Sequence, residues 1–304
     1  MLATLKSNLF PVVRAALLVV FFTAGLVVNA AAFQPVAGDF STILNNRSGQ
    51  LTVWQYKENP EIYVFDFPGM GYQGRSFNRI TQLTEQQSKG EHHQRILTEK
   101  EMNAYLMAAR RTEANFAYGH DVMVHELTKF FNLADRDSVA LYPEEIAIRD
   151  FLVAQGMLRN WRGFWQFIQP NVVILAIPQT QEKNATEPMI TSDARYAILL
   201  HEMAHGEYYT NPYYAQYCRR FWGESMTDNQ RKAFETFLGK AGYDAGDGEL
   251  LVNEMQAYLM FTPDPASFSA RKLGVSEQEL ATIRAAFRSG RPPTRLPLHF
   301  NVPQ

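Results

Sequence analysis

The sequence predicts an α+β fold, with a small sheet in its first half and a mainly helical second half. Short runs of aromatic and β-branched residues, bounded by turn residues, occur at 51–56, 61–67 and 171–177. From residue 191 onward, longer segments with helical spacing of apolar residues follow one another, several of them with a capping residue. The chain has 304 residues, 46% of them hydrophobic, which is enough for one large or two small domains with a real core.

Residues 1–32 have the pattern of a signal peptide. Lys6 and Arg14 are its basic residues, residues 15–28 are apolar, and small residues at 29–32 offer a cleavage site after Ala30 or Ala32. The alternative is an uncleaved anchor, because residues 15–33 nearly reach the roughly 20 residues that a membrane span needs. The chain would contact a membrane only if this segment remained.

The net charge and the cysteine content limit which cellular compartment and which binding partners we expect. Cys218 is the only cysteine, so an intramolecular disulfide is impossible, and we expect it to lie in the core. An exported chain without disulfides fits a bacterial periplasm or a secreted bacterial protein, with inner-membrane anchoring facing the periplasm as the alternative. The formal net charge of −2 gives no reason to expect nucleic acid as a partner.

Residues 33–190 are expected to form the α+β part. Residues 33–46 predict an extended lead-in, residues 51–56 and 61–67 a hairpin, and residues 68–74 a flexible loop. Trp161, Phe164, Trp165 and Phe167 are spaced three and four apart, which favours core positions, and residues 171–177 predict a strand. Helices are expected at 76–87, from a capping box at 98–101 to about 117, at 121–133 and at 143–155.

Residues 191–209 predict a buried helix that carries two histidines on one face. Thr191 or Ser192 caps its start, and His201 and His205 are four residues apart, so their rings project from the same side. The helix is apolar nearly all round, and imidazoles and a carboxylate in a dry helix are costly unless something satisfies them. A zinc ion held by both imidazoles, with Glu202 beside a bound water, meets that need. The alternative is a pair of core histidines bonded to backbone carbonyls, with Glu202 at the surface.

Glu254 is the candidate for a third ligand. It lies on a predicted helix that Asp247 can cap, at the centre of an apolar stripe. A carboxylate in that position must be paired, protonated or bound to a metal. The alternative is a pair with a buried arginine. The stripe consists of Leu250, Leu251, Ala257, Tyr258 and Phe261.

Residues 201–205, His-Glu-Met-Ala-His, followed on a later helix by Asn253 and Glu254, resemble the gluzincin type of zinc metallopeptidase, the group that includes thermolysin. The resemblance covers residues 191–261. It implies a zincin-like fold, zinc ligation by His201, His205 and Glu254, and Glu202 as general base. Gluzincins usually add a histidine or tyrosine that stabilises the oxyanion. Here the candidates are Tyr208, Tyr243 and Tyr258, and the sequence does not choose among them.

The resemblance also suggests how substrate binds. A strand, a loop and then the zinc helix is the order in which metallopeptidases place an edge strand above the metal. We therefore expect residues 171–177 to be an edge strand to which an extended peptide can add. The helical part carrying the zinc site is expected to span residues 191–290, followed by a proline-rich tail, residues 291–304, laid along the domain surface.

The expected function is that of an exported zinc metallopeptidase acting on peptide or protein substrates. A zinc amidase acting on cell-wall peptides would use the same chemistry and is an alternative. A second alternative is a catalytically inactive, membrane-tethered interaction protein whose metal site is structural.

Overall fold

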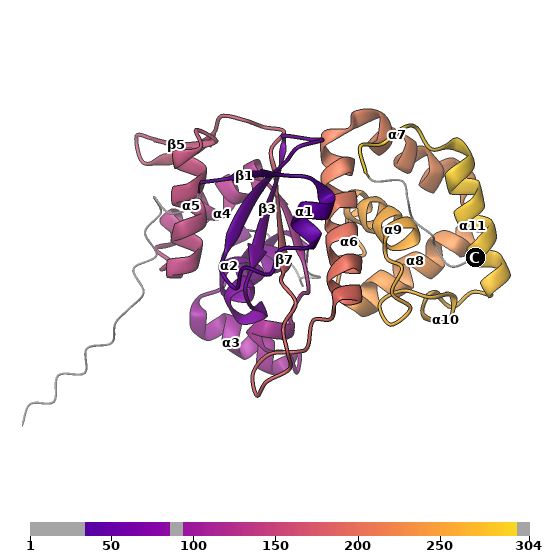
Figure 1. The fold of residues 1–304 in the computed structure, drawn as a ribbon, viewed down its shortest axis with the longest axis horizontal. Helices are drawn as coiled ribbons and strands as arrows, with labels where there is room; N and C mark the ends of the chain where they lie inside the picture. Colours follow the sequence, from indigo (N-terminus) through magenta and orange to yellow (C-terminus); the bar gives the residue numbers. More distant parts are fainter. Residues whose placement is uncertain (1–33, 86–93, 297–304) are drawn as a thin grey trace, which may run out of the picture.

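The computed structural model describes residues 34–85 and 94–296 and shows a mixed α+β protein (Figure 1). The described residues form a five-stranded sheet in the order β1-β2-β3-β7-β4, and a separate hairpin of β5 and β6. The strands are β1 (Val36–Gly38), β2 (Thr52–Tyr56), β3 (Ile62–Phe67), β4 (His120–Met123), β5 (Leu158–Trp161), β6 (Phe164–Phe167) and β7 (Val173–Pro178).

The sheet is mixed, and its strand order corrects one prediction. β2 and β3 are antiparallel, as the predicted hairpin requires, whereas β7 pairs parallel to β3 and antiparallel to β4. The prediction that residues 171–177 form an edge strand is wrong, because β7 lies between β3 and β4. Every residue of β7 is buried, as expected of an inner strand covered on both faces. The edge strand on this side is β4.

Both faces of the sheet are covered by helices. Along β3, Ile62 and Val64 point into one apolar cluster, and Tyr63, Phe65 and Phe67 point into the other. The first cluster continues through α6 into the C-terminal helices, and the second is shared with the N-terminal helices on the opposite face (Figure 1). One core therefore runs from the sheet to the C-terminal helices.

Two N-terminal helices begin at other residues than predicted, at Met70 and Val124, and the helix capped by Thr98 ends at Ala108 and not near residue 117. Residues 68–74 are not a loop: α2 begins at Met70, and a Cβ on Gly74 would lie 2.1 Å from the Glu113 carbonyl oxygen, so this glycine permits close packing. The described residues 34–46 contain β1 and a short helix rather than an extended lead-in. The elements are α1 (Phe40–Leu44), α2 (Met70–Thr84), α3 (Glu99–Ala108), the 3₁₀ turn η3 (Glu113–Asn115), α4 (Val124–Asp137) and α5 (Pro143–Ala154).

The β5–β6 hairpin overturns the core placement of three aromatic residues. Trp161, Phe164 and Phe167 are 56%, 68% and 46% exposed. Their spacing of three and four is helical, but Arg162 and Gly163 have φ values of 52° and 87° and reverse the chain between them. The spacing of three and four between these aromatic residues therefore comes from a hairpin with a two-residue turn and not from a helix.

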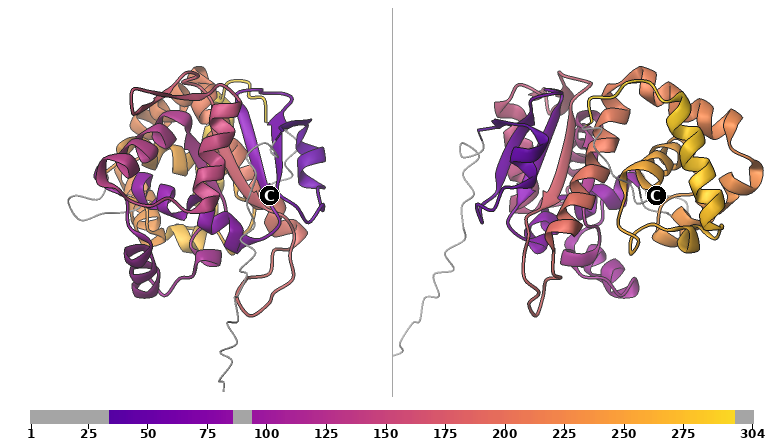
Figure 2. Two further views of the ribbon diagram at one scale, coloured as in Figure 1. Left: turned by 90° about the vertical axis from the view of Figure 1, so that its left-hand side faces the viewer. Right: turned by 45° about the vertical axis from the view of Figure 1, so that its right-hand side comes forward.

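The C-terminal part is helical and packs against α6 (Figure 2). Thr191 caps α6, Asp247 caps α9, and Cys218 is buried, all as predicted. Residues 291–296 lie along the protein, with Leu296 buried and the Arg295 carbonyl accepting from the Tyr56 hydroxyl. The elements are α6 (Ser192–Thr210), α7 (Pro212–Arg220), the π-helical turn η4 (Phe221–Ser225), α8 (Asp228–Ala241), α9 (Gly248–Phe261), α10 (Ala270–Leu273) and α11 (Glu277–Gly290).

The predicted signal peptide at 1–32 lies outside the described residues, so its cleavage stays a prediction. Among the helices that the structure does describe, none combines the length and the apolarity needed to cross a bilayer.

Candidate metal centre

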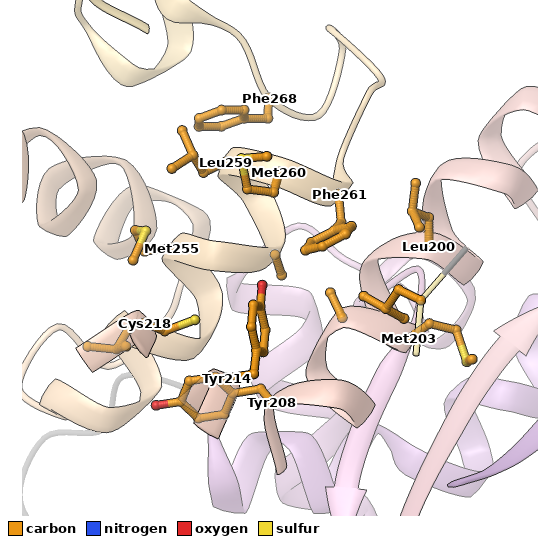
Figure 3. Packing of buried hydrophobic residues seen from close by; sticks show 14 of the residues in the cluster. Leu200, Met203, Tyr208, Tyr214, Cys218, Met255, Leu259, Met260, Phe261 and Phe268 are labelled. Atoms are coloured by element: carbon orange, nitrogen blue, oxygen red, sulfur yellow. The ribbon is translucent and has the colours of Figure 1, made fainter. Parts of the chain in front are cut away.

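The structure brings together the three residues predicted as metal ligands. α6 and α9 pack against each other, and buried side chains of both helices, among them Leu200, Met203 and Phe261, fill the surrounding core (Figure 3). One ligand atom from each of His201, His205 and Glu254 lies within 4.8 Å of the others. These three side chains therefore form a group that could hold a metal ion.

The separations fit a small tetrahedral ion. The Nε2 atoms of His201 and His205 are 3.1 Å apart, and each lies 3.7 Å from an oxygen of Glu254. Tetrahedral zinc with bonds of 2.0–2.2 Å places neighbouring ligand atoms about 3.3 Å apart. The group thus needs only small adjustments to close around zinc.

A hydrogen bond determines which nitrogen of His201 is free to bind a metal. The Thr262 hydroxyl donates its one proton to the Ala257 carbonyl at 3.0 Å, so at His201 it can only accept. Nδ1 of His201, 2.8 Å from that hydroxyl, must be the protonated nitrogen. Its Nε2 lone pair is therefore directed at His205 and Glu254, the arrangement that second-shell partners impose on metal-binding histidines.

Glu202 lies beside this group as a buried carboxylate without a complete set of partners. The residue is 5% exposed, and Oε2 has no hydrogen-bond partner among the described residues. Burial raises the pKa of this carboxyl well above its usual value, and the charges of Asp121 and Glu254 raise it further. Burial also raises the pKa of Glu254 to about 7, although His205 opposes this. Clustered carboxylates that repel one another are relieved either by protonation or by a cation, and a divalent metal would supply the cation.

Gly119, which sequence reasoning missed, holds Glu202 in place by having no side chain. A Cβ at this position would lie 2.1 Å from Oε1 of Glu202 and 2.7 Å from its Cγ. Gly119 directly precedes β4, so the backbone at the start of this edge strand lies next to the Glu202 carboxylate of α6. No local sequence pattern indicated this contact.

Replacing Gly119 by alanine is therefore expected to displace Glu202 and leave the three ligands in place. For the peptidase activity that the sequence predicts, we expect turnover to fall about 100-fold, the cost of misplacing a reacting group by about 1 Å, while metal content stays unchanged. Steady-state rates and metal analysis of the same preparation measure both. Gly239→Ala is the matched control, because its added Cβ meets only the Ala245 Cβ at 3.9 Å. Full activity of Gly119→Ala would show that Glu202 has no fixed role.

The three tyrosines considered for oxyanion stabilisation occupy different places. The Tyr208 hydroxyl donates to Glu249 at 2.7 Å and is already engaged. The Tyr258 ring packs on the His201 ring with centroids 4.7 Å apart, and its hydroxyl lies 3.3 Å from that of Tyr243. The Tyr243 hydroxyl also lies near enough to Glu254 to lower the pKa of that carboxyl. The structure thus places Tyr243 and Tyr258 beside the metal-binding group.

Asp121 is the second residue that sequence reasoning missed. Its Oδ1 lies 3.8 Å from Nε2 of His205, and with Glu202 and His205 it forms a second group of possible ligands. Both groups use His205. Burial lowers the pKa of this histidine, but Asp121 and Glu254 outweigh the effect and raise it overall. The sequence predicts that residue 121 begins a helix, whereas it lies in the short edge strand β4.

Comparison of the chain with protein-family models, with curated proteins and with solved structures finds no match. The functional argument therefore rests on the residues and their geometry.

Proposed function

We propose that this protein is an exported zinc metallopeptidase with a zincin-like fold, in which His201, His205 and Glu254 hold the zinc ion. The observation that carries the proposal is the convergence of these three side chains from two helices, at separations suited to zinc, next to Glu202 with a free buried oxygen. The tautomer of His201, which leaves its Nε2 lone pair available to a metal, also supports the proposal. A structural pair of core histidines would need neither feature.

In this proposal the chain positions the groups for amide hydrolysis. Bound zinc would act as a Lewis acid and lower the pKa of a water molecule toward about 7. Glu202 takes the proton of the attacking water and then passes it to the leaving amine. The hydroxyl of Tyr243 or Tyr258 donates a hydrogen bond to the developing oxyanion. The buried setting of Glu202 keeps bulk water from competing for its proton.

Peptide recognition is assigned to β4 in place of residues 171–177. β4 pairs with β7 on one side, and no described strand pairs with its other side. It also carries Asp121 and follows Gly119, both of which contact the candidate site. An extended peptide could add to this edge through main-chain hydrogen bonds, which select a backbone and not a particular sequence.

Removal of the metal tests the function as a whole. We expect the mature protein to hydrolyse casein, to lose this activity after dialysis against dipicolinate, and to regain it with zinc but not with magnesium. Peptidoglycan fragments assayed in parallel separate a peptidase from a cell-wall amidase. Hydrolysis that survives complete metal removal would contradict the proposal.

A further inference from the structure

A cavity of about 430 Å³ adjoins the candidate metal centre. It lies between β4 and α4 on one side and α6, α7 and α9 on the other. Two of its lining residues touch the centre: Asp121 lies 3.8 Å from His205, and Asn253, the neighbour of Glu254, interacts with the His205 ring. Its volume falls within the about 300–1,000 Å³ typical of ligand sites.

The cavity wall is strongly acidic. Arg219 is its only lysine or arginine among the described residues, and its Nε already lies 2.9 Å from a Glu249 carboxylate oxygen. His125 also lines the cavity, but burial lowers its pKa and keeps the ring neutral. Four carboxylates of the wall thus have no lysine or arginine partner among the lining residues. The acidic lining residues are Glu85, Asp121, Glu126, Asp247 and Glu249.

Two of these four carboxylates already serve the fold. Glu126 accepts from the Met123 amide at 2.8 Å, and Asp247 caps α9 by accepting from the Glu249 and Leu250 amides. None of these amides brings a cation into the wall, and burial raises the pKa of Glu126 to about 7. The other two, Glu85 and Asp121, have no such structural role.

Glu85 and Asp121 lack the hydrogen bonds that buried carboxylates normally accept from their surroundings. The Asp121 side chain is 9% exposed and accepts no hydrogen bond from the described residues. Oε1 of Glu85 is buried and also has no partner. Burial raises the pKa of Glu85 well above its usual value, and Asp121 is the charge that adds most. With zinc held by His201, His205 and Glu254, the charges of Glu254 and Glu202 would balance the ion, and Glu85 and Asp121 are left outside this ligand set.

We propose that this cavity binds a positively charged group of a peptide, either a Lys or Arg side chain or a free α-amino group, beside the metal centre. The proposal rests on the proposed function for the identity of its ligand as a peptide. Asp121 and Glu85 supply the missing charge-assisted acceptors. Tyr209, Leu250 and Ala215 also line the cavity and offer apolar contact for the stem of a basic side chain.

Binding to the Glu202→Gln protein, loaded with zinc, tests this without catalysis. Binding is measured by calorimetry for two charged probes and their neutral counterparts. The first is acetyl-Ala-Ala-Lys-Ala-Ala-amide, compared with the same blocked peptide with norleucine for lysine. The second is Ala-Ala-Ala-amide with a free amino terminus, compared with its acetylated form. We expect a charged probe to bind about tenfold or more tightly than the neutral one, as for a charge-assisted hydrogen bond. This advantage should shrink as salt is added. The probe that gains identifies the source of the charge, side chain or terminus.

Isosteric variants assign the effect to the cavity. Asp121→Asn and Glu85→Gln should each remove most of the preference, whereas Glu277→Gln, an exposed carboxylate on α11, should keep it. Equal binding of charged and neutral probes, or full preference in both cavity variants, would overturn the inference. Casein hydrolysis by the wild-type protein would leave the proposed function standing in that case, so the two failures are distinguishable.

Discussion

Replacement of Glu202 by glutamine is expected to lower peptide hydrolysis by about 10²- to 10⁴-fold, the usual contribution of a general acid–base group. Glutamine has nearly the same size and can still pack against Gly119, but it cannot take up a proton. Its neutral amide also relieves the repulsion between Glu202 and the charges of Asp121 and Glu254. Metal content should therefore stay at the wild-type level while turnover falls.

The measurement is the turnover number of purified wild type and variant on one fluorogenic peptide, with zinc determined in the same samples. Asp193→Asn is the matched control, because Asp193 lies exposed in the first turn of the same helix. A Glu202→Gln protein with wild-type turnover would remove the general-base assignment. Loss of zinc together with activity would instead make Glu202 a ligand.

Replacement of Asp66 by alanine is expected to destabilise the protein by about 3–5 kcal/mol, the cost of leaving a buried charge without its partner. Asp66 on β3 and Arg195 on α6 are both fully buried. The Arg195 guanidinium makes five hydrogen bonds, two to Asp66 and three to the carbonyls of Ile43, Leu44 and Pro178. Five donors are all that arginine has.

This network also sets the position of α6, the helix that carries His201 and His205. Asn46 and Trp54 donate to the same Asp66 carboxylate, so the aspartate is held from two further elements. Arg195 lies six residues before His201 on α6. The network therefore anchors α6, the helix that carries both imidazoles, against the sheet. The Asp66 variant should bind zinc less tightly as well as unfold more easily.

Urea denaturation of wild type and Asp66→Ala measures this loss. The control is Asp150→Ala, which breaks the partly exposed pair with Arg149 and should cost at most about 1 kcal/mol. The double variant Asp66→Leu with Arg195→Met should be more stable than Asp66→Ala, because it leaves no unpaired charge. A loss below 1 kcal/mol for Asp66→Ala would show that the pair does not anchor α6.

The helices and the three ligands were predictable because their signals are local. Thr191 and Asp247 cap their helices through their own side chains, and a spacing of four puts His201 and His205 on one face. Glu254 was recognisable as a carboxylate on an apolar stripe. Each signal lies within one helix, and the structure brings the three residues together as expected.

The rest of the site depends on contacts between distant segments. β4 has four residues, too few for a period, and the sequence therefore predicts a helix at Asp121. The prediction of an edge strand at residues 171–177 came from the resemblance to metallopeptidases, and the strand order contradicts it. Gly119 matters only because β4 runs close to Glu202, and Thr262 only because it follows the end of α9 beside His201. Such roles follow from strand order and helix packing, which the sequence pattern does not specify.

Metal analysis of the purified mature protein tests the central claim most directly. We predict one zinc ion per chain in the wild-type protein and in Glu277→Ala, a control that removes an exposed carboxylate of α11. Glu254→Ala should lose most of the zinc, because only the two imidazoles remain of the three ligands. Wild-type protein that binds no zinc when the metal is supplied, or Glu254→Ala with a full complement, would contradict the account.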